Sequence, residues 1–103
     1  MANQERKPFS PGEILKEEFM EPLGLTQEEL AKRLGISRRR INEVIRGHRE
    51  ITPDTALRLS KAFRVSPELW LNLQQRYNLW LIAHDPKKRK QYLSIKPIKA
   101  KAA

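Results

Sequence analysis

The 103-residue sequence predicts an all-α domain of five helices, preceded by a short arm and followed by a basic tail. Two observations carry this prediction. Paired helix start and stop residues mark five segments between residues 10 and 83, and apolar residues recur within those segments at helical spacing. No alternating strand pattern competes with them. We therefore expect an arm over residues 1–9, one helical domain over residues 10–83, and a tail over residues 84–103.

The first two helices are marked by capping boxes, in which two side chains satisfy free backbone amides at a helix start. Ser10 lies three residues before Glu13, and Thr26 lies three residues before Glu29. We expect the first helix to end before Pro22, because proline disrupts the interior of a helix. The second helix is expected to be short.

The second and third helices follow one another so closely that they predict a helix-turn-helix corner. Gly35 supplies the left-handed backbone conformation that ends the second helix after Leu34, and Ser37 caps a third helix that runs to Arg46. Ala31 is small enough for the two helices to cross at close range. The apolar residues expected to hold the third helix against the core are Ile36, Ile41, Val44 and Ile45.

The fourth and fifth helices begin at two further cap-and-proline pairs. Thr52 with Pro53 starts the fourth helix, and Ser66 with Pro67 starts a fifth over residues 67–83. The fifth helix carries apolar residues on more than one face. It therefore needs two surfaces to pack against, which we take to be the domain core and a partner.

Charge is distributed unevenly along the chain, whose formal net charge is +9. Residues 84–103 contribute +6 of it, residues 32–49 contain seven basic residues and one acid, and residues 12–21 contain four glutamates and one lysine. One face should be basic and another acidic. The acidic face is either solvated or meets a basic partner. The tail is either a disordered solubilising end or a phosphate-attracting one, with residues 92–95 as its one stretch able to form a short strand.

The composition argues against several functional classes. There is no cysteine, and the two histidines, His48 and His84, lack clustered carboxylates, so we expect no metal, no cofactor and no disulfide. No nucleophile–base pair or glycine-rich phosphate loop predicts an enzyme or a small-molecule substrate. No apolar run has the roughly 18 residues of a membrane span, and the absence of cysteine favours a cytoplasmic protein.

The outer side of the third helix carries the residues expected to contact DNA bases. Arg38 and Arg39 follow the helix start, where arginine can donate two hydrogen bonds to guanine. Asn42 can pair with adenine, and Glu43 can accept from cytosine or orient a neighbouring arginine. The residues expected to contact phosphates around them are Gln27, Ser37, Arg40, Arg46, His48 and Arg49.

At these residues the chain resembles the Cro/repressor (XRE-like) helix-turn-helix family, and more narrowly the HigA-type antitoxins. The resemblance covers residues 8–83 and stops at the basic tail. It is carried by the stretches at residues 11–15, 21–27, 38–42, 51–59 and 66–74.

The resemblance implies a homodimer that binds an inverted-repeat operator in double-stranded DNA, represses its own operon and neutralises a HigB-type, mRNA-cleaving toxin. Two alternatives stay open: a stand-alone regulator without a toxin partner, and an adaptor whose fold binds protein in place of DNA. The residues expected at the dimer interface are Trp70, Leu73, Tyr77, Trp80 and Leu81.

Overall fold

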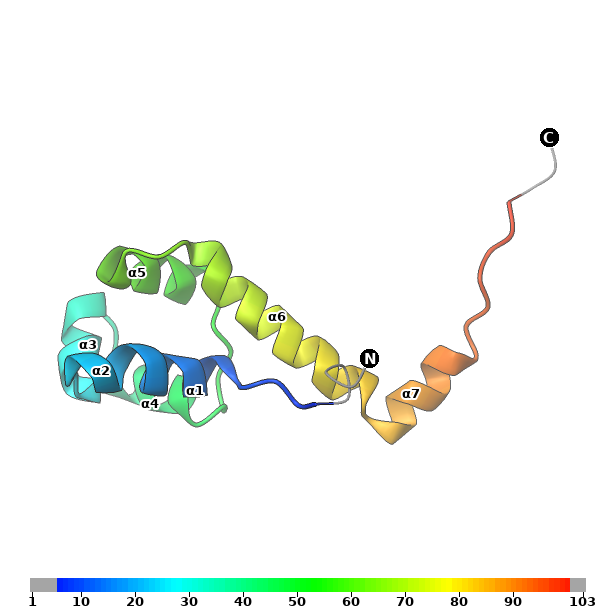
Figure 1. The fold of residues 1–103 in the computed structure, drawn as a ribbon, viewed down its shortest axis with the longest axis horizontal. Coiled ribbons are helices and arrows are strands. Elements are labelled where there is room, and N and C mark those ends of the chain that lie inside the picture. Colours follow the sequence, from blue (N-terminus) through cyan, green and yellow to red (C-terminus); the bar gives the residue numbers. More distant parts are fainter. Residues whose placement is uncertain (1–5, 101–103) are drawn as a thin grey trace.

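A computed structural model describes residues 6–100 of the chain, and this range is helical throughout apart from short loops and the two ends (Figure 1). The all-α prediction is confirmed. The helices are α1 (Pro11–Ile14), a π-helical segment η2 (Leu15–Met20), α2 (Glu21–Leu23), α3 (Gln27–Leu34), α4 (Arg38–Ile45), α5 (Pro53–Phe63), α6 (Pro67–Ala83) and α7 (Pro86–Leu93). None of the helices within residues 6–100 combines the length and apolar character needed to cross a bilayer.

The first predicted helix runs on past Pro22, so the expectation that it ends before this residue is wrong. Segments α1, η2 and α2 form one continuous rod that ends where Gly24 adopts a left-handed conformation. In η2 the amide of Glu21 donates to the carbonyl of Lys16, five residues earlier. This wider turn leaves room for the proline ring, and it shifts the bonding pattern so that the missing amide of Pro22 interrupts no regular α-turn.

Both predicted capping boxes form. The Ser10 amide donates to Glu13 Oε1 at 2.9 Å, and the Glu13 amide donates to Ser10 Oγ at 3.2 Å. The Thr26 and Glu29 pair repeats this geometry at 2.9 and 3.1 Å. The hydrogen bonds that the backbone amides of Ser10 and Thr26 donate lower the pKa of the Glu13 and Glu29 carboxyls, because these bonds stabilise the charged carboxylate.

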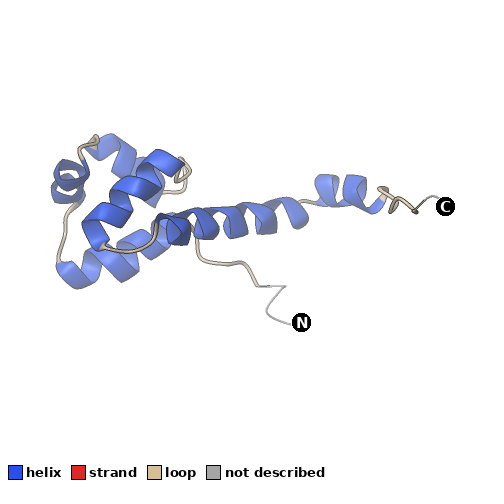
Figure 2. Cartoon of the chain, turned by 90° about the horizontal axis from the view of Figure 1, so that it is seen from above, coloured by secondary structure: helices blue, strands red, loops and turns tan. Residues whose placement is uncertain are grey.

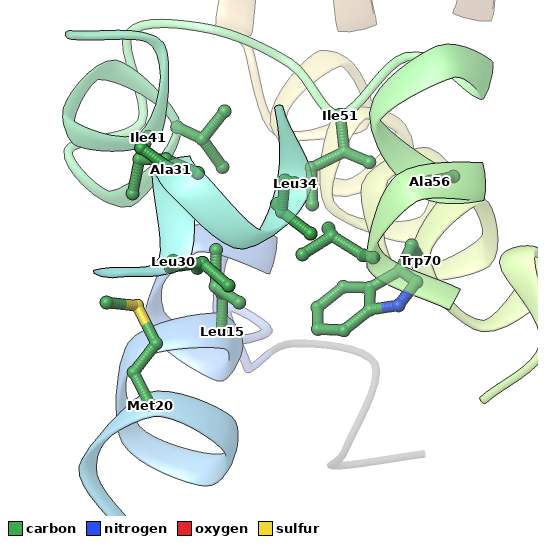
Figure 3. Close-up of a cluster of buried hydrophobic side chains, with 11 residues drawn as sticks. Leu15, Met20, Leu30, Ala31, Leu34, Ile41, Ile51, Ala56 and Trp70 are labelled. Carbon is green, nitrogen blue, oxygen red and sulfur yellow. The ribbon is translucent and has the colours of Figure 1, made fainter. Parts of the chain in front are cut away.

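The core lies where the first rod, α3, α4, α5 and the start of α6 meet (Figure 3). Trp70 lies in this core with no exposed surface, and the centroids of its ring and the Phe19 ring are 4.8 Å apart. The buried apolar residues around it are Leu15, Met20, Leu30, Ala31, Leu34, Ile41, Val44, Ile51, Ala56 and Leu59. This packing fixes the positions of α3 and α4 relative to the rest of the domain.

One close helix crossing was not foreseen from the sequence. Gly12 lies directly against α4, and a β-carbon built on it would lie 2.1 Å from the Val44 carbonyl oxygen and 2.8 Å from the Ile45 Cα. Only a residue without a side chain allows α1 and α4 to approach this closely.

The second half of α6 projects from this core and leads to α7, which gives the chain a long axis of 59 Å (Figure 2). The alternative of a disordered tail is wrong for residues 86–93, which form α7. Asp85 caps this helix by accepting the Lys87 amide at 3.0 Å. Residues 92–95 form no strand, since Tyr92 and Leu93 close the helix. Residues 1–5 of the expected arm and residues 101–103 of the tail lie outside the described range.

Candidate DNA-binding interface

The predicted helix-turn-helix corner is present between α3 and α4. Gly35 ends α3 with φ 70° and ψ 33°, as the corner requires, and Ser37 caps α4 by accepting the Arg40 amide at 3.1 Å. Ala31 is 4% exposed at the crossing of the two helices. Arg58, on α5, donates to the Leu34 carbonyl at 2.8 Å and so holds the end of α3. The corner is therefore held from both of its helices and from α5.

Helix α4 is buried on one side and open on the other. Ile41 and Val44 are buried, and Ile36 and Ile45 pack partly against the core, as predicted. The opposite side carries the residues expected to face DNA, and their spacing of three or four places them on one face of the helix. On this face Arg38, Arg39 and Arg46 are exposed, whereas Asn42 and Glu43 are half-buried.

Glu43 holds two arginines at this surface. Its Oε2 accepts from Arg39 Nε at 3.2 Å, and its Oε1 lies 2.7 Å from Arg49 Nη2. Hydrogen bonds from Arg49 and then Arg39 lower the pKa of the Glu43 carboxyl, because both cations favour its charged form. Of the two roles expected for Glu43, these contacts are the kind that orienting a neighbouring arginine would need. The Arg39 side chain stays 86% exposed, so its remaining donors are free to meet a ligand.

Asn42 and Gln27 join the outer side of α4 to the start of α3. Asn42 Nδ2 donates to Gln27 Oε1 at 3.2 Å. The contact fixes the Asn42 amide within the corner and leaves its oxygen without a partner among the described hydrogen bonds. The structure thus brings an expected base contact and an expected phosphate contact side by side.

Arg40 departs from the expectation of a phosphate contact. Its Nη2 donates to Asp54 Oδ2 at 2.9 Å and to Thr55 Oγ1 at 2.6 Å, and its side chain is 25% exposed. Asp54 also accepts from Arg58 Nε at 2.9 Å. The hydrogen bond from Arg58, and to a smaller extent that from Arg40, lowers the pKa of the Asp54 carboxyl. Arg40 therefore ties α4 to the start of α5, a role that its place within an arginine triplet did not indicate.

The remaining expected phosphate contacts lie in and beside the loop that follows α4. Arg46 and His48 are exposed, and Arg49 has half of its side chain exposed while it pairs with Glu43. Ser37 is exposed at the other end of α4. Together these residues border the outer side of α4 at both of its ends.

The residues predicted at a dimer interface fall into two groups. The prediction for Trp70 is wrong, because this side chain is fully buried within its own protomer and has no surface left to contact a second one. Leu73 packs partly against that core, and Tyr77 and Trp80 are half-buried. Leu81 is 41% exposed. The interface residues thus remain a proposal only for the second half of α6.

The second half of α6 also exposes two apolar residues that were not expected at an interface. Leu79 is 63% exposed and Ile82 is 44% exposed. Leu79 lines a groove of about 760 Å³ between the described part of the arm and the end of α6, together with Phe9, Trp80 and His84. The Trp80 and His84 rings stack with their centroids 4.0 Å apart.

The helix-turn-helix family model matches residues 16–70 of the chain. An HTH-type transcriptional regulator of Haemophilus influenzae is 41% identical over 92 residues, which are 89% of this chain and 86% of that protein. The antitoxin HigA-1 of Vibrio cholerae is 40% identical over 80 residues, 78% of this chain and 75% of the relative.

Solved structures extend the comparison to the whole fold. The Pseudomonas aeruginosa antitoxin HigA, solved with the higBA promoter, superposes with a TM-score of 0.82 at 34% identity. The match covers 89% of this chain and 99% of that one. The chain belongs to the helix-turn-helix family, in the Cro/repressor-like group whose members include the HigA antitoxins.

Proposed function

We propose that this protein is an operator-binding repressor that works as a dimer, with the outer side of α4 in the major groove. The observation that carries the proposal is the exposed face of α4, where Arg38 and Arg39 reach into solvent from a corner whose inner side packs into the core. The P. aeruginosa relative solved with its promoter supports the same assignment. Arg38, Arg39 and Asn42 are the proposed base contacts, with Glu43 orienting Arg39.

The phosphate contacts follow from this placement. Gln27 lies at the start of α3, where helix amides face an approaching phosphate, and Ser37, Arg46, His48 and Arg49 border α4. Contacts of this kind position the protein without selecting a sequence. Arg40 is left out of the set, because its guanidinium already bonds Asp54 and Thr55.

A dimer accounts for the apolar surface of α6. Trp80 and the exposed Leu79 line the groove beside the arm, whereas Tyr77 and the exposed Leu81 lie on another side of α6. We place the two-fold contact on the side of Leu79 and Trp80, where a second copy of the chain would cover both side chains. A two-fold dimer of this kind places its two recognition helices about 34 Å apart and requires an inverted-repeat operator. Light scattering of the purified protein should give twice the monomer mass, and the substitution Leu79→Glu should reduce it to the monomer mass.

The toxin-neutralising role rests on the HigA relatives. We propose that the protein binds and inhibits an mRNA-cleaving toxin of the HigB type and represses the operon that encodes both. The alternative is a stand-alone regulator, which the H. influenzae relative supports because its name states only transcriptional regulation. The antitoxin role would be favoured if the neighbouring gene encodes a small basic ribonuclease and that ribonuclease co-purifies with the protein.

A footprint on the gene's own upstream DNA tests the proposal. The expected result is protection of an inverted repeat with half-sites about one helical turn apart, and weaker binding to a scrambled duplex of the same length. Repeating the footprint with the co-purifying partner tests the antitoxin role. Equal binding to the upstream and scrambled duplexes would refute operator recognition, and the absence of any salt-dependent binding would favour the protein-binding adaptor.

A further inference from the structure

The residues after α6 form a basic element that the helix-turn-helix site does not use. We name residues 86–100 the basic extension. It contains Lys87, Lys88, Arg89, Lys90, Lys96 and Lys99, and it contains no acidic residue. Every residue in it is exposed, and none of the ion pairs among the described residues involves it. Its six positive charges therefore exceed the single negative charge of Asp85, the acidic residue next to it in the sequence.

The order of helix α7 concentrates this charge. Asp85 caps the helix by accepting the Lys87 amide at 3.0 Å, and its one negative charge offsets only one of the four consecutive basic residues of α7. Four consecutive basic residues turn by about 100° each along a helix and so cover all of its sides. Such a helix attracts a polyanion from any direction of approach.

We propose that the basic extension is a second, sequence-independent contact of this protein with the phosphates of duplex DNA. This inference rests on the proposed function, because the operator held by α4 is the polyanion that the extension would meet. The alternative of a lipid surface is disfavoured by α7 itself. A membrane-surface helix needs an apolar face opposite its basic one, whereas the large apolar residues of α7 are confined to its end, at Tyr92 and Leu93.

The dimensions of the molecule allow the contact. The extension lies beyond the end of α6, and the chain's long axis of 59 Å corresponds to about 17 base pairs at 3.4 Å each (Figure 2). With this axis laid along the duplex, the extension would reach the DNA that flanks the operator. Tethering of this kind raises the local concentration of phosphates around the extension.

The expected size follows from how many charges can face DNA together. Since α7 has basic side chains on all sides, about two of its four can approach one duplex at a time. Each phosphate that the protein neutralises makes the plot of log K against log salt concentration steeper by about 0.9. Removing the charges of α7 should lower the magnitude of that slope by about 2 for each bound protomer. For each protomer, the unmodified protein should then lose about tenfold more affinity between 50 and 200 mM salt than the neutral variant.

The test compares two variants of the full-length chain. In the neutral variant Lys87, Lys88, Arg89 and Lys90 are all replaced by glutamine, and in the charge-preserving variant the three lysines are replaced by arginine. Glutamine and arginine are both good helix formers, and circular dichroism checks that α7 persists. Binding to the operator duplex and to a scrambled duplex of equal length is measured as a function of salt.

We expect the salt dependence of binding to fall by the same amount on both duplexes for the neutral variant. For the charge-preserving variant it should stay unchanged. An unchanged slope in the neutral variant would overturn the proposal, as would a loss confined to the operator. Binding of the unmodified protein alone to phosphatidylserine vesicles, with an unchanged duplex slope, would assign the extension to a membrane and also overturn it. If the unmodified protein binds both duplexes equally, operator recognition fails, while the slopes on the scrambled duplex still decide the role of the extension.

Discussion

Replacing Gly12 with alanine would place a methyl group between α1 and the recognition helix α4. A β-carbon at this position lies 2.1 Å from the Val44 carbonyl oxygen and 2.8 Å from both the Cα and the carbonyl oxygen of Ile45. All three are backbone atoms, which cannot rotate away as a side chain would. The two helices must therefore separate by about 1 Å or more to restore ordinary contact distances.

The size of the effect follows from that separation. Overpacking a filled core costs about 1–3 kcal/mol, and we expect the upper end because Leu15 and Val44, buried beside the crossing, lose contacts as well. For a domain of this size each kcal/mol lowers the melting temperature by about 4–8 °C, so Gly12→Ala should lower it by about 12–24 °C. Operator affinity should fall too, since α4 moves with the contact.

Thermal unfolding followed by circular dichroism measures the effect, with Gly47→Ala as the matched control. Gly47 has a positive φ of 77°, but a β-carbon added to it would have no atom within 4 Å. That control carries only the backbone strain of about 1 kcal/mol. If Gly12→Ala melts no lower than Gly47→Ala, the close crossing of α1 and α4 is not as described.

Three further substitutions test the core and the polar contacts of α4. Trp70→Ala should lower the free energy of unfolding by about 3–5 kcal/mol in urea, and a loss below about 1 kcal/mol would place Trp70 outside the core. Asp54→Asn should destabilise the protein above about pH 4, where the wild-type carboxylate is charged and pairs with Arg40 and Arg58. Because the folded-state pKa of Asp54 is lowered, this stabilisation is lost as the pH falls through that pKa, so melting curves of the two proteins should converge at the acidic end. A difference that persists there would exclude the ion pairs as its cause. Glu43→Gln should strengthen binding to scrambled DNA and weaken discrimination for the operator, and an unchanged ratio of the two dissociation constants would argue against an orienting role.

The local parts of the fold could be predicted from the sequence. Caps at Ser10 and Ser37 and the left-handed Gly35 depend on residues close together in the chain, so short-range patterns suffice to identify them. The first helix passed Pro22 because a π-helical turn made room for the ring, and no sequence pattern specifies such a turn. Helix α7 was missed although Asp85 and Pro86 carry the same start pattern as the other helices.

The candidate site was predictable in outline but not in its side-chain contacts. The spacing of Arg38, Arg39 and Asn42 was enough to place them on the open face of α4. The diversion of Arg40 depends on Asp54, fourteen residues away, which reaches it only through the packing of α5. The burial of Trp70 likewise depends on how α6 meets the core, since its own helix has apolar residues on several sides.

In the proposed complex the outer side of α4 distinguishes bases, while the residues around it hold the DNA backbone. The most direct measurement compares Arg39→Ala and Arg49→Ala on the operator, on operators with single base-pair changes, and on scrambled DNA. We expect Arg39→Ala to lose about 1–3 kcal/mol at one base position and to relax the preference there, whereas Arg49→Ala should weaken binding to every duplex alike. Equal losses on operator and scrambled DNA for both variants would contradict this claim.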